Sequence, residues 1–526
     1  MYPTSPEYQV AVYAQLAKRR VVGKVTFDIT DVDAYTDVSS IVVTAEEPII
    51  SNRLQLANQN RNPSINIATL EPGRFKLDGS LSFADGETPA YNGERGYVSQ
   101  EICGADGVFV VEPTITITFG STHSSAGLTV SFDQLNGEYA THFTAVAYDA
   151  SDNVIDTVAI TDNTEVVCVF YGQLLDYKKI VVTVHRWSVG HRRARVLEVD
   201  FGLVEVYDDN VLISTDLIEE MDMTSSQLPS TEFGFTVDNS SRRFNILNPT
   251  GIYKYLQQRQ IVIAELGIDT GGGVIEYVPL GRYLLWEWTS DEGSLTASFT
   301  ARTNLDLMSN YEYEQLTASS KSLAALAAQI FAQCGISNYE IDPALSAIST
   351  NSMSEKVDCK ELLQMIAIAG CANIYISRDN VIHLKQLTLG ASVDRVDFDN
   401  IYNEPQIELE RIVRQVEVTY WTDLDTSAIS TVTAPGVTLG DVLKLEGNTL
   451  INASGRAAAV ASWLLAQKQY RAKYSVNWRG NPAHELSDVI AIENTFGGDM
   501  DAMITKNELT YAGYLRARTE ARGAVN

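Results

Sequence analysis

One short segment of the sequence gathers side chains that could recognise a ligand. Trp187 is followed by His191, Arg192, Arg193 and Arg195, which puts an aromatic ring and three guanidinium groups on one predicted loop. Rigid aromatic rings and planar guanidinium groups suit sugar faces and acidic surfaces. We therefore predict a glycan-binding site at Trp187, His191, Arg192 and Arg193. In the alternative interpretation, Trp187 packs beneath a β-sandwich and the arginines pair with neighbouring carboxylates.

The rest of the sequence offers little catalytic chemistry. It contains no GxSxG, HExxH, Walker-type lysine or CxxC motif. The sequence therefore shows no common motif for a catalytic nucleophile, a zinc site or a nucleotide-binding loop. The six histidines lack metal-ligand spacing, and Gly271–Gly273 favours a turn because no helix follows it. A glycosidase-like pair could still occur among the 67 Asp and Glu residues, because its signature is a distance in space. We expect no enzymatic activity, no cofactor and no bound metal.

Composition indicates a β-rich protein of several domains. At 526 residues, 45% of them hydrophobic, the chain is too long for one core and suggests roughly three or four domains. The 25 Tyr and 16 Phe residues, with abundant Val, Ile and Thr, favour strands over helices. The formal net charge of -28 argues against DNA binding, because nucleic-acid affinity depends on basic groups that neutralise phosphates.

Cysteine usage and the absence of targeting segments bear on where the chain folds. The N-terminus, Met1 to Glu7, has no basic region before an apolar run, so no secretory signal is predicted. The most apolar helical stretch, Leu323 to Ile336, is too short to span a bilayer. We expect synthesis in the cytoplasm and no membrane span. The five cysteines form no CxxC pair and should be reduced core thiols: Cys103, Cys168, Cys334, Cys359 and Cys371.

Residues 114 to 201 show short strand patterns at nearly even spacing. Seven such strands separated by turn residues predict a β-sandwich or jelly roll. A polar, Gly- and Glu-rich stretch precedes them and a new β pattern starts after Gly202, so we place this domain at residues 86–202. The predicted strands are Thr114–Phe119, Leu128–Phe132, Phe143–Tyr148, Val154–Ile160, Val166–Phe170, Ile180–Arg186 and Arg195–Phe201.

Helical periodicity is confined to the second half of the chain. Ser322 is the predicted N-cap of a first helix, because an apolar stripe of helical period follows it. Asp358 begins a capping box that predicts a second helix. A hairpin follows, from Asn373–Ile376 to Val381–Leu384. One long helix is predicted from about Ala453 to Tyr470.

The predicted fold is mainly β with a minor α+β part. The segments on either side of the jelly roll each lack a complete sheet. We therefore predict that residues 1–85 and 203–310 are the two parts of one barrel, with residues 86–202 inserted between them. Residues 311–395 should form a small α+β domain from the two helices and the hairpin. Residues 396–526 should form a second barrel that carries the long helix.

Two parts of the sequence resemble parts of phage tail proteins. Phe132 to Gly202 is similar to the galactose-binding-like jelly rolls, of carbohydrate-binding-module type, found inserted in such proteins. Pro229 to Leu307, together with the helices, hairpin and C-terminal barrel that follow, resembles phage baseplate-hub and tail-associated proteins. The motifs that carry the resemblance are Asn136-Gly137-Glu138-Tyr139-Ala140, Tyr148-Asp149, Glu232-Phe233-Gly234-Phe235-Thr236-Val237-Asp238-Asn239, Gly281-Arg282-Tyr283 and Asn481-Pro482.

The resemblance implies a structural virion protein at the tail tip. Members of the family form a trimeric ring that caps the tail tube, so the implied partners are two further copies, the tail tube or distal tail protein, the tape-measure protein and tail fibres or receptor-binding proteins. The jelly roll would bind a host cell-wall saccharide, and genome DNA would be passing cargo only. The chain stops soon after the second barrel, at Asn526, so we expect no attached peptidase or lysozyme domain.

Two alternatives to the hub interpretation stay open. A distal-tail adaptor with a carbohydrate-binding insert would usually assemble as a hexamer, so subunit stoichiometry separates it from a hub. A carbohydrate-active surface protein would use the jelly roll as its binding module. The missing secretory signal and the unpaired cysteines weigh against that second alternative.

Overall fold

The chain folds into two compact units, each of which is treated on its own. Unit 1 comprises Met1–Val25, Tyr207–Ser241 and Val262–Asn526, and unit 2 comprises Thr26–Val206 and Arg242–Ile261. Strands β1 (Val21–Thr30) and β10 (Gly202–Tyr207) contain two of the points where the chain passes from one unit to the other. The structure, a computed structural model, describes residues 1–15, 18–63, 66–69, 71–82, 93–290, 293 and 295–525. The domain boundary predicted at residues 85 and 86 lies outside the described residues.

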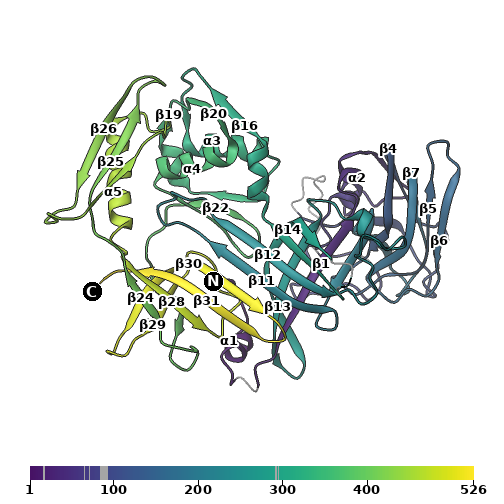
Figure 1. The fold of residues 1–526 in the computed structure, drawn as a ribbon. Helices are drawn as coiled ribbons and strands as arrows, with labels where there is room; N and C mark the ends of the chain where they lie inside the picture. Colours follow the sequence, from purple (N-terminus) through teal and green to yellow (C-terminus); the bar gives the residue numbers. More distant parts are fainter. Residues whose placement is uncertain are drawn as a thin grey trace. The chain divides into compact units, whose positions relative to one another are not determined.

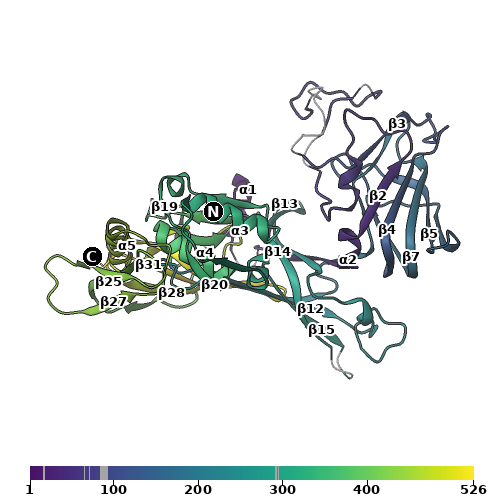
Figure 2. The ribbon, with the colours of Figure 1, turned by 90° about the horizontal axis from the view of Figure 1, so that it is seen from above.

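Unit 2 is built around an antiparallel sheet in the order β2-β4-β7-β5-β6, with β9 beside β4. Figure 2 shows β2, β4, β7 and β5 of this sheet. A separate two-stranded sheet, β3 with β8, contributes side chains to the same apolar core. Three short helices, α2 and the 3-10 helices η1 and η2 (Tyr253–Tyr255), complete the described part of the unit. The bounds are β2 Val38–Val43, β3 Tyr97–Ile102, β4 Thr114–Ser131, β5 Ala140–Tyr148, β6 Val154–Ile160, β7 Val167–Trp187, β8 Arg193–Val196, β9 Glu198–Asp200, α2 Val32–Thr36 and η1 Arg53–Ala57.

Two pairs of predicted strands each form one long strand. Thr114–Phe119 and Leu128–Phe132 fall largely within β4, and Val166–Phe170 and Ile180–Arg186 fall largely within β7. The pairing of β4 with β7 shifts register repeatedly between Thr118 and Gly127. Such irregularities bend a strand without ending it, so the turn-like residues there break the sequence pattern and not the strand.

The sheet of unit 2 also takes in an early segment of the chain. Strand β2 pairs antiparallel with β4, from Val38 opposite Phe119 to Val43 opposite Ile115. The sequence pattern instead predicts these residues in the first part of a barrel, residues 1–85. The pairing is non-local, and a single sequence contains no signal for it. The predicted domain division as a whole stays a prediction.

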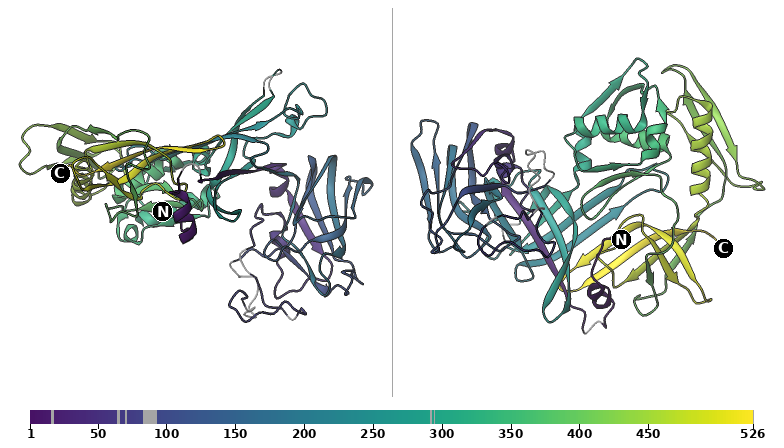
Figure 3. Two further views of the ribbon diagram at one scale, coloured as in Figure 1. Left: turned by 90° about the horizontal axis from the view of Figure 1, so that it is seen from below. Right: turned by 180° about the vertical axis from the view of Figure 1, so that it is seen from behind.

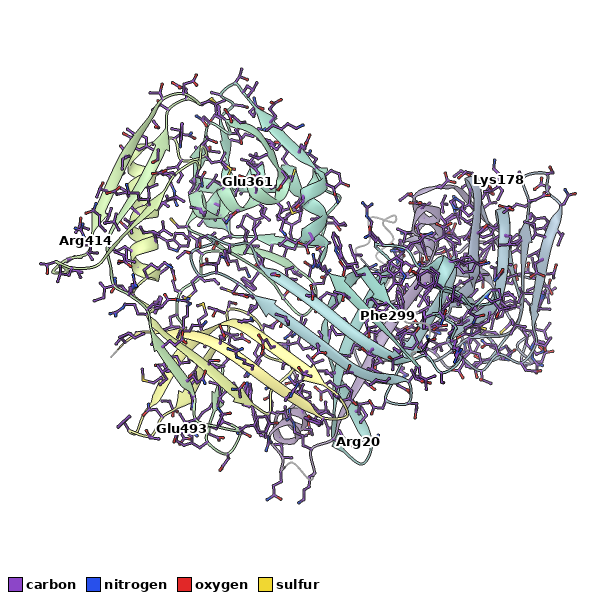
Figure 4. The ribbon with its side chains drawn as sticks, in the orientation of Figure 1. Arg20, Lys178, Phe299, Glu361, Arg414 and Glu493 are labelled. Atoms are coloured by element: carbon purple, nitrogen blue, oxygen red, sulfur yellow. The ribbon has the colours of Figure 1, made fainter. Side chains whose placement is uncertain are left out.

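Unit 1 contains a large, mainly antiparallel sheet in the order β13-β14-β15-β12-β11-β30-β31-β28-β24 (Figure 1). Strand β29 pairs antiparallel with β30, and β23 pairs parallel with β29. Phe299 of β15, which is labelled in Figure 4, stacks on its cross-strand partner Phe235 of β12 at 4.8 Å between ring centroids. The bounds are β11 Leu212–Glu220, β12 Ser230–Asp238, β13 Ile261–Gly271, β14 Val274–Thr289, β15 Thr296–Arg302, β23 Asp394–Val396, β24 Gln406–Leu409, β28 Ala472–Trp478, β29 Val489–Glu493, β30 Asp499–Tyr511 and β31 Leu515–Gly523.

This sheet joins segments that the sequence analysis assigned to two separate barrels. Strand β11 pairs with β30, from Thr215 opposite Tyr511 to Glu220 opposite Lys506. Strands from residues 203–310 and from residues 396–526 therefore share one hydrogen-bonded ladder. The mainly β fold class with a minor helical part is confirmed, and the two predicted barrel segments meet as one continuous sheet.

The predicted helices and hairpin of unit 1 are present. Helix α3 (Leu323–Gln333) is capped by Ser322, whose side chain accepts a hydrogen bond from the Ala325 N–H. Helix α4 (Cys359–Gly370) is capped in the same way by Asp358. The two helices pack together beside the small strands (Figure 1). The bounds of the strands are β16 Glu312–Gln315, β17 Lys321–Ser322, β18 Tyr339–Ile341, β19 Ser349–Thr350, β20 Ser354–Asp358, β21 Asn373–Ile376 and β22 Ile382–Lys385.

The long helix predicted near residues 453 to 470 is α5 (Ser454–Gln467). It packs against a three-stranded sheet in the order β26-β25-β27 (Figures 1 and 3), formed by β25 (Val413–Trp421), β26 (Ser427–Thr433) and β27 (Asp441–Leu445). Helix α1 (Pro6–Val12) lies near the N-terminus. Within the described residues, every helix is too short or too polar to cross a membrane. All five cysteines are unpaired, and Cys103, Cys334 and Cys359 are buried.

Candidate functional site

The predicted aromatic platform is a core side chain. Trp187 ends β7 and is 1% exposed. Its ring meets that of Phe132 edge-on at 5.8 Å between centroids, and its Nε1 donates a hydrogen bond to Glu138 Oε2 at 3.1 Å. A ring covered in this way has no free face for a sugar. The burial corrects the expectation that Trp187 stacks on a ligand, and it matches the alternative in which this residue packs beneath the sandwich.

The neighbouring cations also have partners inside unit 2. Arg192 Nε donates to Glu138 Oε1 at 3.1 Å, and Arg193 pairs with Glu47 at 3.4 Å. The exposed His191 adopts a left-handed backbone conformation, with φ of 57°. These contacts position the loop and use several of the N–H donors of its two guanidinium groups. The proposed glycan contact of His191, Arg192 and Arg193 stays a prediction.

The arginines belong to a buried network of charges. Arg195 and Arg74 lie against the carboxylates of Glu71 and Asp133, with Arg74 Nη2 at 3.1 Å from Asp133 Oδ2. Burial raises the pKa of Glu71, but the hydrogen bond and charge of Arg195 outweigh it and lower that pKa to about 2. Buried charges are tolerated when they are paired and hydrogen-bonded. The arginine cluster is therefore a structural element of unit 2.

A groove opens next to Trp187, where β5 begins and β7 ends. Its volume is about 460 Å³. Four chain segments converge there, which is how loops at the end of a sandwich usually form a site. The lining residues are Ala105, Asp106, Tyr139, Thr141, His142, Thr161, Asp162, Asn163, Thr164, Arg186, Trp187, Ser188 and Gly190.

The groove combines a partly exposed aromatic ring with fixed polar groups. Tyr139 and His142 are half-buried, and Asp106, Asp162 and Arg186 are exposed. Arg186 Nε donates to the carbonyl oxygen of Asp106 at 2.8 Å, which holds the guanidinium in place. An aromatic face with carboxylate and guanidinium groups around it can bind a polar ligand that has one flat face.

Sequence reasoning missed most of this groove. Among the predicted residues only Trp187 lines it. Tyr139 belongs to a motif of the family resemblance, whereas Asp106, Asp162 and Arg186 have no signal in the sequence, because each lies in a separate turn or strand end. Their convergence exists only in the folded chain.

One nucleophile-like arrangement occurs in unit 1. His383 lies between Ser377 and Glu340, with Nε2 at 2.9 Å from Ser377 Oγ and Nδ1 at 3.0 Å from Glu340. However, Ser377 Oγ donates to the Asp379 carboxylate at 2.5 Å, so the serine proton is directed away from the imidazole. A serine nucleophile needs its proton to pass to the base. This hairpin is therefore not arranged for acyl transfer. The described residues hold no group of side chains that could bind a metal ion.

The sheet of unit 1 ends in an apolar edge. All four residues of β24 are exposed, including Ile407 at 60% and Leu409 at 61%. Beside it lies a cleft of about 140 Å³ whose lining includes Ile407, Tyr474 and Phe496, the last being 96% exposed. Unpaired sheet edges and large exposed apolar side chains mark surfaces that associate with other chains.

No protein-family model and no curated protein matches this chain. A tail protein from Neisseria meningitidis is 11% identical over 60% of this chain and 93% of its own, with a TM-score of 0.42. A prophage tail protein from Shewanella oneidensis is 10% identical over 60% and 94%, with a TM-score of 0.41. A chitosan-binding module from Paenibacillus is 11% identical over 33% and 98%, with a TM-score of 0.21. The chain is similar to these tail proteins and, over a third of its length, to a chitosan-binding module.

Proposed function

We propose that this chain is a structural, non-enzymatic hub protein of a phage tail tip, located in the virion and assembled as a homotrimer. The ring joins the tail tube, or a distal tail protein, to the host-contacting apparatus. The tape-measure protein and tail fibres or receptor-binding proteins are its other proposed partners. The proposed hub comprises residues 1–85, 203–310, 311–395 and 396–526, and the proposed insert comprises residues 86–202, except that β2 pairs with β4 in the sheet of unit 2 and therefore goes with the insert.

The observation that carries this proposal is the apolar edge of the unit 1 sheet. Ile407 and Leu409 on β24 and Phe496 beside them would be costly to leave in water on a monomer. In a ring of subunits, the apolar edge of each subunit is buried against a different patch of the next subunit. Such heterologous interfaces can close into a ring. The chain's net charge of -28 also suits a ring that lets DNA pass without binding it.

The double change Ile407→Lys and Leu409→Lys is expected to convert the trimer to monomer. Each lysine would place an unpaired charge in the interface at a cost of several kcal/mol, so association should weaken at least about 100-fold. Native mass spectrometry of the full chain at fixed concentration measures the change. Ile429→Lys is the matched control, because Ile429 is also an exposed isoleucine, at 61%, but on the separate strand β26. Six copies in the wild type would favour the distal-tail adaptor, and a wild-type monomer would contradict both assignments.

We also propose that unit 2 binds a host cell-wall saccharide in the groove beside Trp187. The half-buried Tyr139 offers the flat apolar face that a sugar ring needs, and Asp106, Asp162 and Arg186 supply hydrogen-bonding groups for its hydroxyls. His191, Arg192 and Arg193 would contribute little to saccharide binding, because their side chains or backbone stabilise the loop.

Tyr139→Ala is expected to weaken binding of the full chain to host cell walls about tenfold, because loss of one stacking face removes roughly 1–1.5 kcal/mol. Glycan arrays and cell-wall sedimentation provide the measurement. Tyr171→Ala is the control, since Tyr171 is a 61% exposed tyrosine of unit 2 outside the groove lining. Equal affinity of wild type and Tyr139→Ala would argue against this groove, and no binding by the wild type would argue against a saccharide role.

A further inference from the structure

His123 connects both ends of one short helix in unit 2. It lies on β4, 8% exposed, and its ring nitrogens face two different carboxylates. Nδ1 is 2.8 Å from Asp31 Oδ2, and Nε2 is 2.8 Å from Asp37 Oδ2. Asp31 and Asp37 are the N-cap and C-cap residues of α2. One imidazole thus holds the two ends of α2 to the sandwich.

The helix that His123 holds is also fixed by other contacts at both ends, because the Asp31 N–H donates to the Phe201 carbonyl oxygen at 3.0 Å and the Gly120 N–H donates to the Asp37 carbonyl oxygen at 2.9 Å. Ala34 is fully buried in the core of unit 2, and the Tyr35 hydroxyl donates to Asp200 Oδ1 at 2.9 Å. Asp37 Oδ2 also accepts hydrogen bonds from the backbone and hydroxyl of Ser121, each at 2.7 Å. A helix of five residues gains little stability of its own, so its position depends on these contacts.

The geometry requires the charged form of the ring. A neutral imidazole has one N–H donor, whereas imidazolium has two. Ionised carboxylates only accept, so both contacts of His123 are hydrogen bonds only when the ring is doubly protonated. In the described part of the chain, His123 is the one cation paired with Asp31 or Asp37. From β7 the ring faces Tyr177, at 6.3 Å between centroids, and from its own strand Phe119, at 5.1 Å.

The surroundings favour protonation near neutral pH. Burial lowers the pKa of His123, but the hydrogen bonds and charges of Asp37 and Asp31 outweigh it, so the pKa lies above its usual 6.5. The hydrogen bond from His123, followed by those from Ser121, lowers the pKa of Asp37 to about 2. Both shifts have the sign expected for groups that stabilise each other's charged forms.

We propose that His123 is a pH-sensitive clamp that holds α2 on unit 2 while the ring is doubly protonated and releases one end of α2 when the ring loses a proton to water. After that loss, a nitrogen lone pair faces a carboxylate and repels it. Because the folded pKa of His123 is raised, its contribution is complete below pH 6.5 and is lost as the pH rises through the folded pKa. On the acid side the contact is lost as the pH falls below 3.8 toward 2, where Asp37 takes up a proton.

Hydrogen exchange of the full chain tests the clamp. After correction for intrinsic exchange rates, the protection of the α2 amides in the wild type should fall roughly tenfold or more between pH 6 and pH 9, as expected for loss of a charge-assisted hydrogen bond. His123→Gln, whose amide has one donor nitrogen and one acceptor oxygen and carries no charge, should show the lower protection at both pH values. His142→Gln should behave like the wild type, because His142 bonds only to its neighbour Thr141.

A second readout needs no substitution. In the full chain labelled with ¹³C-histidine, the His123 ring should titrate above pH 6.5. A wild-type α2 whose protection does not change between the two pH values, or an equal fall in His123→Gln, would overturn the proposal. A His123 ring that titrates at or below 6.5 would overturn it as well, even if the variant does not fold.

Discussion

Replacing Arg61 with alanine is expected to lower the free energy of unfolding of unit 2 by about 3–5 kcal/mol, because truncating one partner leaves buried charge uncompensated. Arg61 is 9% exposed and lies between two fully buried carboxylates. Its Nη2 is 2.8 Å from Asp28 Oδ2 and 2.6 Å from Asp200 Oδ1, and its Nε donates to Asp200 Oδ2 at 2.7 Å. Glu198, also fully buried, adds a third acidic group, and its pKa is raised by burial and by Asp200.

The deficit of Arg61→Ala should depend on pH with a defined sign. Arg61 lowers the pKa of the buried Glu198, so without the guanidinium the folded pKa of this carboxyl rises further above its unfolded value. Groups of that kind stabilise the fold at low pH and lose this contribution as the pH rises. The variant should therefore lie closer to the wild type at pH 5 than at pH 8.

Differential scanning calorimetry or denaturant titration of the full chain at both pH values measures the effect. Arg53→Ala is the matched control, because the ion pair of Arg53 with Glu46 is in unit 2 but its side chain is 49% exposed. Exposed pairs contribute below about 1 kcal/mol. A soluble Arg61→Ala within 1 kcal/mol of the wild type at pH 7 would contradict the assignment of Arg61 as the counterion of this cluster.

Local signals in the sequence predicted the helices and the hairpin of unit 1 well. Ser322 and Asp358 cap α3 and α4 as expected, because a cap bonds to an N–H three residues away and needs no distant partner. The β21–β22 hairpin has the same local origin, since its strands are joined by a short turn through Asn380, which has a φ of 62°.

Contacts between distant segments could not be predicted in the same way. The pairing of β11 with β30 merges two predicted barrel segments, and β2 joins β4 across a long intervening stretch. Strand patterns show which residues can pair and leave the partner strand unspecified. The contacts of the candidate site could not be predicted for the same reason. The sequence singles out Arg192, but only the fold shows that its partner is Glu138.

Trp187→Ala is expected to destabilise unit 2 by about 3–5 kcal/mol, since deletion of a buried aromatic side chain loses its burial and leaves a cavity. Trp187 is 1% exposed and packs on Phe132. Trp187→Phe should cost about 1–2 kcal/mol, because the ring is largely kept while one hydrogen bond to a charged acceptor is lost. Glu138 would still be paired with Arg192 and Arg74 in that variant.

The two roles of Trp187 make different predictions for cell-wall binding. If Trp187 is a core residue, the loss of binding in Trp187→Ala should follow the unfolded fraction of unit 2 and recover on cooling, whereas the loss in Tyr139→Ala should persist in a fully folded chain. Thermal unfolding and cell-wall sedimentation of the same samples separate these outcomes. A Trp187→Ala chain that unfolds at the wild-type temperature and yet fails to bind would restore Trp187 as a ligand contact. In that case the ring must leave the core when the saccharide arrives, at the cost of its contact with Phe132 and its hydrogen bond to Glu138.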